Sequence, residues 1–292
     1  MSMRKISLMW IFAFSVVFVI FQLIPQNYAD NNTSGEVTVI PLLPSVQEMV
    51  SLIGAGKNIV AVSQHSVWPE EVLELPKIGG YQGINYEKIA LISPQYVLLT
   101  DALRETKENF EKMGINFVEL KDNTVDEILN SIIEVGRLVD YEKNARKLVE
   151  EIKKKLTILE KKSEKIKERN KKVLIVVGFS GELKNLYVAG KNNFLNEIIE
   201  KIGYQNAYSG DLIYPSLSAE DIIKINPDAV IILDERTEIA DVEREAVRKE
   251  WSKIDINANK NGKVGIINGD YVFLPGPRFI QTAEDFTEFL SK

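Results

Sequence analysis

The sequence of 292 residues contains no cysteine and a single histidine, His65. The lack of cysteine excludes disulfide bonds, thiolate nucleophiles, cysteine metal ligands and a lipid-modified N-terminal cysteine. A lone imidazole cannot build a zinc site from several histidines. The net charge is −6, and basic residues form no block outside one helix. We therefore expect no nucleic-acid partner.

Motifs of common enzymes are also missing. Gly178-Phe179-Ser180-Gly181 begins like a nucleophile elbow, but Glu182 stands where the second glycine is needed. The segment 54–57 lacks the spacing and the hydroxyl residue of a phosphate-binding loop, and it fails as a dinucleotide fingerprint. We expect neither catalysis nor a resident cofactor.

The N-terminal segment has the pattern of an export signal. Arg4 and Lys5 precede an apolar run over 6–24, and a cleavage site follows Ala29, with Asn27 as an imperfect −3 residue. The run is also nearly long enough to span a bilayer, so a retained anchor is the alternative. In either case we expect the globular part outside the cytoplasm, in the periplasm or on the extracellular face of the membrane.

One sequence pattern occurs twice. In 85–99 and in 218–232, a helix-capping residue is followed two places later by a glutamate, then by a short apolar helix, a proline and a strand. The glutamates are Glu87 and Glu220. The duplication indicates two lobes of one plan, with a ligand held between them.

A second pair of similar segments, 48–54 and 197–203, supports the duplication. Strand and helix patterns alternate in both halves, which favours parallel α/β sheets. The first helix is expected to begin at Ser45 as N-cap, with Glu48 completing a capping box.

A charged stretch, 141–170, separates the two halves. Its apolar residues form one helical stripe, and no glycine or proline interrupts it. At about 1.5 Å per residue, such a helix is long enough to cross between lobes. We favour a rigid interlobe helix, and the alternative is a surface helix packed on one lobe.

The predicted fold is therefore α/β, with two Rossmann-like lobes joined by a single long rigid helix. The expected divisions are a signal peptide or anchor at 1–29, an N-terminal lobe at 36–138, the helix at 139–170 and a C-terminal lobe at 171–292.

In this order and spacing, the motifs resemble those of the helical-backbone solute-binding proteins of ABC importers for iron complexes and vitamin B12. The resemblance covers 37–290. The motifs are Leu43-Pro44-Ser45, Glu48, Ile78-Gly79-Gly80-Tyr81, Glu87-Lys88-Ile89, Ser93-Pro94, the long helix, Ser218-Ala219-Glu220, Asn226-Pro227-Asp228, Trp251 and Pro275-Gly276-Pro277-Arg278.

The resemblance implies a monomeric, non-catalytic protein that binds a small-molecule metal chelate between its lobes. It also implies that Glu87 and Glu220 meet arginines of an ABC permease dimer in the membrane. The simpler interpretation is that each glutamate is only favoured by the dipole in the first turn of its helix.

Loops after the strand ends are expected to line the cleft, as in other open α/β sheets. Aromatic rings there suit a large, flat or greasy ligand, although each ring can equally pack beneath its loop. Tyr81 and Tyr214 resemble the aromatic clamp of B12-binding relatives. The candidate ligand contacts are His65, Trp68, Tyr81, Phe179, Tyr214, Tyr271, Phe273 and Arg278.

Two of these candidates have open roles. His65 is a possible axial ligand of haem iron or corrinoid cobalt, or an ordinary hydrogen-bonding side chain. Arg278 either meets an acidic ligand group or is a buried, paired arginine that fixes its loop.

A corrinoid ranks slightly first as ligand, a ferric siderophore close behind and haem third. Anionic chelates usually need several cations, and here only Lys184, Arg104 and Arg236 are candidates. The chain departs from B12-binding relatives at Thr100, Val177 and Leu274, while Asp270 is kept. A membrane-tethered sensor or interaction protein with this fold is the second alternative.

Overall fold

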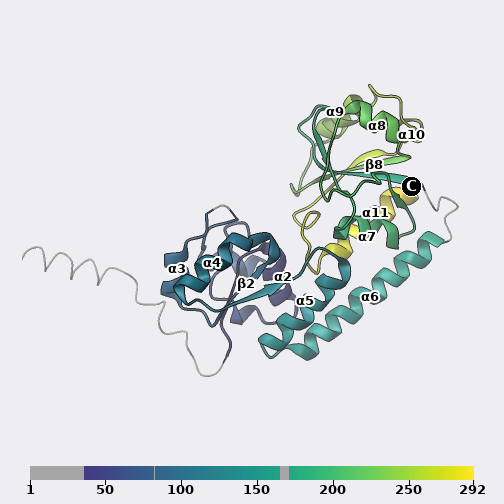
Figure 1. The fold of residues 1–292 in the computed structure, drawn as a ribbon. Helices are drawn as coiled ribbons and strands as arrows, with labels where there is room; N and C mark the ends of the chain where they lie inside the picture. The colour runs from purple at the N-terminus through teal and green to yellow at the C-terminus, as the bar shows by residue number, and fades with distance from the viewer. Residues whose placement is uncertain (1–35, 82, 165–170) are drawn as a thin grey trace, which may run out of the picture.

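The computed structural model describes residues 36–81, 83–164 and 171–292. The predicted signal peptide or anchor at 1–29 and the end of the predicted interlobe helix, 165–170, lie outside these ranges. Within them, no helix combines the length and apolar character needed to cross a membrane. The chain forms two α/β lobes that lie side by side, and a long helix, α6, runs along both of them (Figure 1).

The N-terminal lobe contains a parallel sheet with strand order β1-β2-β3. Beside this sheet, isolated bridges join Val39 to Ile59 and Val62 to Lys77. The strands are β1 (Val39–Pro41), β2 (Tyr96–Thr100) and β3 (Phe117–Leu120), the α-helices α2 (Pro44–Leu52), α3 (Tyr86–Ile92), α4 (Arg104–Met113) and α5 (Val125–Leu138), and the 3-10 turns Gly56–Asn58, Glu70–Glu74 and Asp101–Leu103.

The C-terminal lobe has a larger, mixed sheet of order β7-β5-β4-β8-β9, with β6 also paired to β4. Its centre, β4-β8-β9, is parallel as predicted, but β5 and β7 form an antiparallel edge that the sequence pattern did not reveal. The strands are β4 (Lys172–Gly178), β5 (Leu186–Val188), β6 (Gln205–Asn206), β7 (Ser216–Leu217), β8 (Ala229–Asp234) and β9 (Val264–Asn268), and the helices α7 (Phe194–Lys201), α8 (Ala219–Ile225), α9 (Asp241–Trp251), α10 (Asn257–Lys260) and α11 (Phe279–Ser291).

Helix α6 (Glu142–Glu164) packs against α5 of one lobe and α11 of the other. Its apolar stripe is buried at Ala145 and Ile152, and Lys155 forms an ion pair of 3.0 Å with Glu284 of α11. A side chain at Gly136 would approach the Cβ of Ala145 to 2.4 Å, so the close crossing of α5 and α6 requires glycine there. The prediction of a helix that joins the lobes is confirmed.

The lobes share one hydrophobic core above α6. Met49 of α2, Ile132 of α5, Ile198 of α7 and Phe286 of α11 belong to a single buried cluster. Each lobe also has its own smaller cluster on the other side of its sheet. The lobes are therefore joined by packing as well as by the helix, since buried apolar area contributes about 25 cal/mol per Å².

The predicted capping box at α2 is wrong. The N-cap is Leu43, whose side chain makes no cap hydrogen bond, and Pro44 is the first helical residue. Proline favours this position because it has no N–H to satisfy and its φ is preset. Ser45 and Glu48 therefore lie inside the helix, and both are buried.

The caps of the duplicated segments are confirmed. The side chain of Asn85 accepts a hydrogen bond from the backbone N–H of Lys88 at the start of α3. Ser218 and Asp221 form a reciprocal capping box at the start of α8. The two helices thus begin in the same way in both lobes, as the sequence repeat predicts.

Candidate functional site between the lobes

A cavity of 540 Å³ lies between the lobes and is lined by residues of both. Its N-terminal-lobe wall follows the ends of β2 and β3, and its C-terminal-lobe wall consists of residues around the start of α7 and of the loop before β7. We call it the interlobe cavity. Its lining residues are Asp101, Asn123, Thr124, Glu127, Asn192, Asn196, Glu197, Glu200 and Ile213. Every charged residue among them is acidic, so the cavity is suited to cations and hydrogen-bond donors.

Hydrogen bonds hold the N-terminal-lobe wall in place. Thr124 and Glu127 form a capping box at the start of α5. The carboxylate of Glu127 accepts from the backbone N–H groups of Asn123 and Thr124 at 3.1 and 3.2 Å. Asp101 accepts from the side-chain amide of Asn123 at 3.1 Å. This wall is therefore fixed without help from a bound molecule.

A buried carboxyl group, Asp122, stands next to this wall. Its side chain is 7% exposed. The pKa of Asp122 is raised to about 7, first by burial and then by the charges of Asp101 and Glu127. Partial burial of Tyr214 in the other lobe, followed by the charge of Asp122, raises the pKa of its hydroxyl, although the residue is still 49% exposed.

Tyr81 and Tyr214, the predicted aromatic clamp, are among the exposed rings of the molecule, at 55% and 49%. Leu212 and Ile213, directly before Tyr214, are 64% and 44% exposed. Sequence reasoning missed this pair, although three apolar residues in a row before Pro215 were a visible signal. That these rings contact a ligand stays a prediction.

Three other predicted rings have partners within the protein. Phe179 packs on Trp251 with ring centroids 6.3 Å apart. Tyr271 donates a hydrogen bond of 2.6 Å from its hydroxyl to Asp285, and Phe273 packs against the shared core. These contacts match the simpler interpretation of packing beneath the loops, and a ligand role for the three stays a prediction.

Arg278 forms a buried ion pair between the lobes. Its Nε donates to Oε2 of Glu48 in α2 at 3.0 Å, and its Nη1 donates to Oδ1 of Asp270 at 2.9 Å. The guanidinium also stacks over the ring of Trp68, 4.3 Å from the centroid. The side chain is nearly inaccessible. The structure thus matches the alternative of a buried, paired arginine whose donors are used within the protein. Arg278 also covers one face of the Trp68 ring.

His65 is exposed on the N-terminal lobe, three residues after the bridge residue Val62. Its Nε2 is 3.2 Å from Nε2 of Gln64. Gly80 permits this position, since a Cβ there would approach the imidazole to 2.6 Å. No group of three or more histidine, aspartate or glutamate side chains suited to a metal ion occurs in the described part of the chain. Axial ligation by His65 stays a prediction.

Glu87 and Glu220 are exposed in the first turns of α3 and α8. Their matched positions on two lobes place an acidic group on each at equivalent points of the repeat. This geometry is compatible with both the docking role and the simple dipole effect, and docking stays a prediction.

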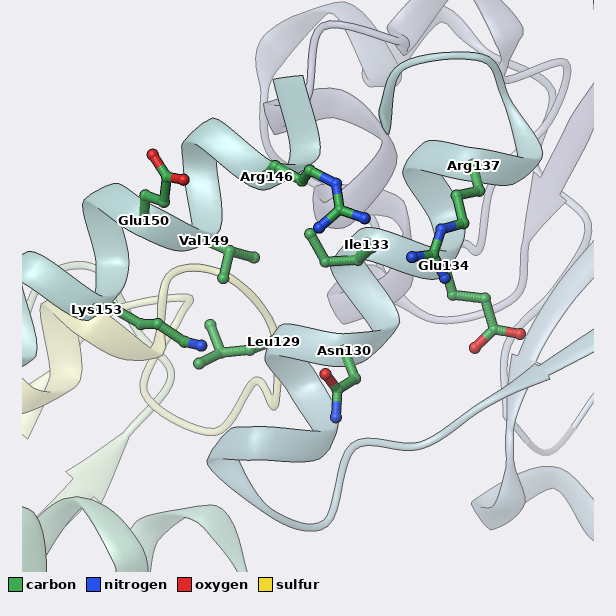
Figure 2. Close-up of a pocket in the computed structure, with 9 residues that line it drawn as sticks. All are labelled: Leu129, Asn130, Ile133, Glu134, Arg137, Arg146, Val149, Glu150 and Lys153. Carbon is green, nitrogen blue, oxygen red and sulfur yellow. The ribbon is translucent and has the colours of Figure 1, made fainter. Parts of the chain in front are cut away.

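A second cavity, of 610 Å³, lies between α5 and α6, away from the strand ends (Figure 2). Its arginines, Arg137 and Arg146, both donate to Glu142 at 3.0 Å. The pair of Arg137 with Glu142 ties α5 to α6, and both arginines of this groove already have a partner within the protein.

Comparison with known proteins places this geometry in a family. Residues 39–271 match the family model of periplasmic binding proteins. An uncharacterised ABC transporter substrate-binding lipoprotein of Bacillus subtilis, YvrC, is 30% identical over 86% of this chain and 78% of its own length. A vitamin B12-binding protein of Vibrio parahaemolyticus is 27% identical over 86% of this chain and 88% of its own length.

Among solved structures, a possible iron-binding (periplasmic solute-binding) protein of Staphylococcus epidermidis is 26% identical, with a TM-score of 0.74. The match covers 88% of this chain and 99% of that one. The matches span both lobes and the helix that joins them. The chain therefore belongs to the periplasmic binding protein family, as a non-enzymatic substrate-binding component of an ABC transporter.

Proposed function

We propose that this protein captures a corrinoid of the vitamin B12 type between its lobes and delivers it to an ABC permease dimer. It acts in the periplasm or on the extracellular face of the membrane, either free or held by the N-terminal anchor. The observation that carries the choice of ligand is the interlobe cavity, whose charged residues are all acidic. Corrinoids carry amide donors and a cationic metal centre, whereas haem and many ferric siderophores carry carboxylates that this cavity would repel.

A ferric siderophore without carboxylates, such as a hydroxamate, is the second candidate. The similarity to an iron-binding protein of 26% identity favours it, and the exposed apolar run at 212–214 suits either ligand.

Titration of the purified protein separates these ligands. We expect cyanocobalamin to bind at least about ten-fold more tightly than haemin, because the acidic walls of the cavity disfavour the haem propionates. Quenching of tryptophan fluorescence measures both affinities. Tyr214→Ala should weaken corrinoid binding by about ten-fold, as expected for an aromatic contact. Tyr187→Ala, an exposed tyrosine of β5 outside the interlobe cavity, is the matched control. Tighter binding of haemin or of a ferric siderophore than of cyanocobalamin would contradict the proposal.

The permease is expected to recognise Glu87 and Glu220. Reversing both charges, Glu87→Arg with Glu220→Arg, should leave ligand affinity unchanged and abolish uptake in cells, because like charges at both contacts repel. Glu111→Arg with Glu245→Arg reverses exposed charges on α4 and α9 as a control. Normal uptake by the first double variant, or equal loss in the control, counts against this docking surface.

A further inference from the structure

Two glutamates at equivalent positions of the sequence repeat each reach into the other lobe. Glu48 of α2 and Glu197 of α7 begin the matched segments 48–54 and 197–203. Glu48 binds Arg278, the residue directly before α11. Glu197 accepts a hydrogen bond of 2.7 Å from the backbone N–H of Val125, the first residue of α5. In each lobe, the helix that receives the contact is the last one.

The two contacts differ in strength. The side chains of Glu48 and Arg278 are 2% and 7% exposed, and the pair is bidentate. Glu197 is only partly buried and makes a single bond. That bond satisfies an N–H at the start of α5 that the local capping box, Thr124 with Glu127, does not use. The carboxylate also benefits from the dipole of the 14-residue helix.

The weaker contact lies in the wall of the interlobe cavity. Glu197 lines that cavity together with Thr124, the neighbour of Val125. The bond between Glu197 and Val125 therefore connects the wall around Asn123 with the wall around Asn196. Its length limits how far the two walls separate.

We propose that Glu48 and Glu197 form two reciprocal contacts between the lobes. Each contact, called here an interlobe clasp, runs from the glutamate of one lobe to a residue of the other lobe. The Glu48–Arg278 clasp holds the lobes together, and the Glu197–Val125 clasp sets the width of the interlobe cavity. Glu197 is thus a positioning residue of the site. The inference rests on the proposed function only in taking this cavity as the ligand site.

The lack of cysteine makes a direct distance measurement simple. Leu91→Cys on α3 and Ile223→Cys on α8 place one spin label on each lobe, at side chains that are 85% and 43% exposed. In ligand-free protein with these labels, we expect Glu197→Ala to broaden the interlobe distance distribution by about two-fold, since one bond between the lobes is lost. Hydrogen exchange of the Val125 amide should become about ten-fold faster for the same reason. Glu197→Gln, which keeps an acceptor oxygen, should restore most of both values.

Glu200→Ala is the matched control. Glu200 lines the same wall one helical turn from Glu197, but the backbone N–H of Val125 donates to Glu197 and not to Glu200. Thermal unfolding of every variant checks that the fold is intact. An unchanged distance distribution in Glu197→Ala, or an equal broadening in Glu200→Ala, would overturn the proposal. Since no ligand is added, this result is independent of whether the protein binds a corrinoid.

Discussion

Arg278→Met is expected to lower the free energy of unfolding by about 3–5 kcal/mol, as measured for buried ion pairs that lose one partner. The variant removes the guanidinium that binds both Glu48 and Asp270. Asp270 is 23% exposed and can be solvated in part, but Glu48 is only 2% exposed. Its carboxylate would remain in the core without a partner, or it would have to bind a proton. Burial already raises the pKa of Glu48, while Arg278 lowers it, so loss of the arginine favours the protonated form.

Urea unfolding of three variants separates charge from packing. Arg278→Lys keeps the charge but loses the planar guanidinium that donates two bonds to Glu48 and further bonds to Asp270, so the loss of stability should be intermediate. Glu48→Leu with Arg278→Met leaves no unpaired charge in α2, and it should recover most of the stability lost in the single variant. If Arg278→Met unfolds within about 1 kcal/mol of the wild type, the ion pair does not hold the lobes together.

The role of Glu48 also shows where sequence reasoning reached its limit. Glu48 lies three residues after Ser45, which favours a capping box, a local interaction between near neighbours. The actual partner, Arg278, is 230 residues away. No local pattern contains that pairing, because it depends on how the two lobes pack. The repeat of 48–54 in 197–203 carried the signal, since an equivalent glutamate in each lobe is expected to have an equivalent role.

Strong helical periodicity was predictable, and very short strands were not. The apolar stripe and the lack of glycine and proline correctly predicted α6. Strands β5 and β7 contain three and two residues, which is too short for an alternating pattern to appear. They exist because β5 pairs with the edge of β4, and β7 pairs with β5. Tertiary pairing, rather than intrinsic preference, decides such strands.

None of the eight predicted ligand contacts is among the residues that line the interlobe cavity. The rule that loops after strand ends line the cleft was applied only to conspicuous rings and to His65 and Arg278. Applied to polar residues, it would have selected Asp101, directly after β2, and the segment 122–124, which begins two residues after the end of β3. Local sequence could not show that Phe179 packs its ring on Trp251 or that Tyr271 donates its hydroxyl to Asp285.

Asp122→Asn is expected to change how stability depends on pH. The folded-state pKa of Asp122 is raised from 3.8 to about 7, by burial first and then by Asp101 and Glu127. Between these two pH values, the folded protein binds a proton that the unfolded chain does not bind. The contribution of Asp122 to stability therefore falls as pH rises through this window and is constant above it. A shift of this size corresponds to at most about 4 kcal/mol, at about 1.4 kcal/mol per unit.

Asparagine is neutral at every pH, so the variant should lose this decline. We expect equal stability of the two proteins near about pH 4, and a more stable variant, by a few kcal/mol, at about pH 8. Urea unfolding across this range measures the difference, and Asp126→Asn, an exposed acid at the start of α5, is the matched control. Parallel profiles for Asp122→Asn and the wild type would show that Asp122 is already ionised at low pH. Ionised Asp122 lowers the stability of the wild-type protein, so a cationic group of a ligand bound beside it would stabilise the folded protein. The same charge therefore bears on the choice of ligand.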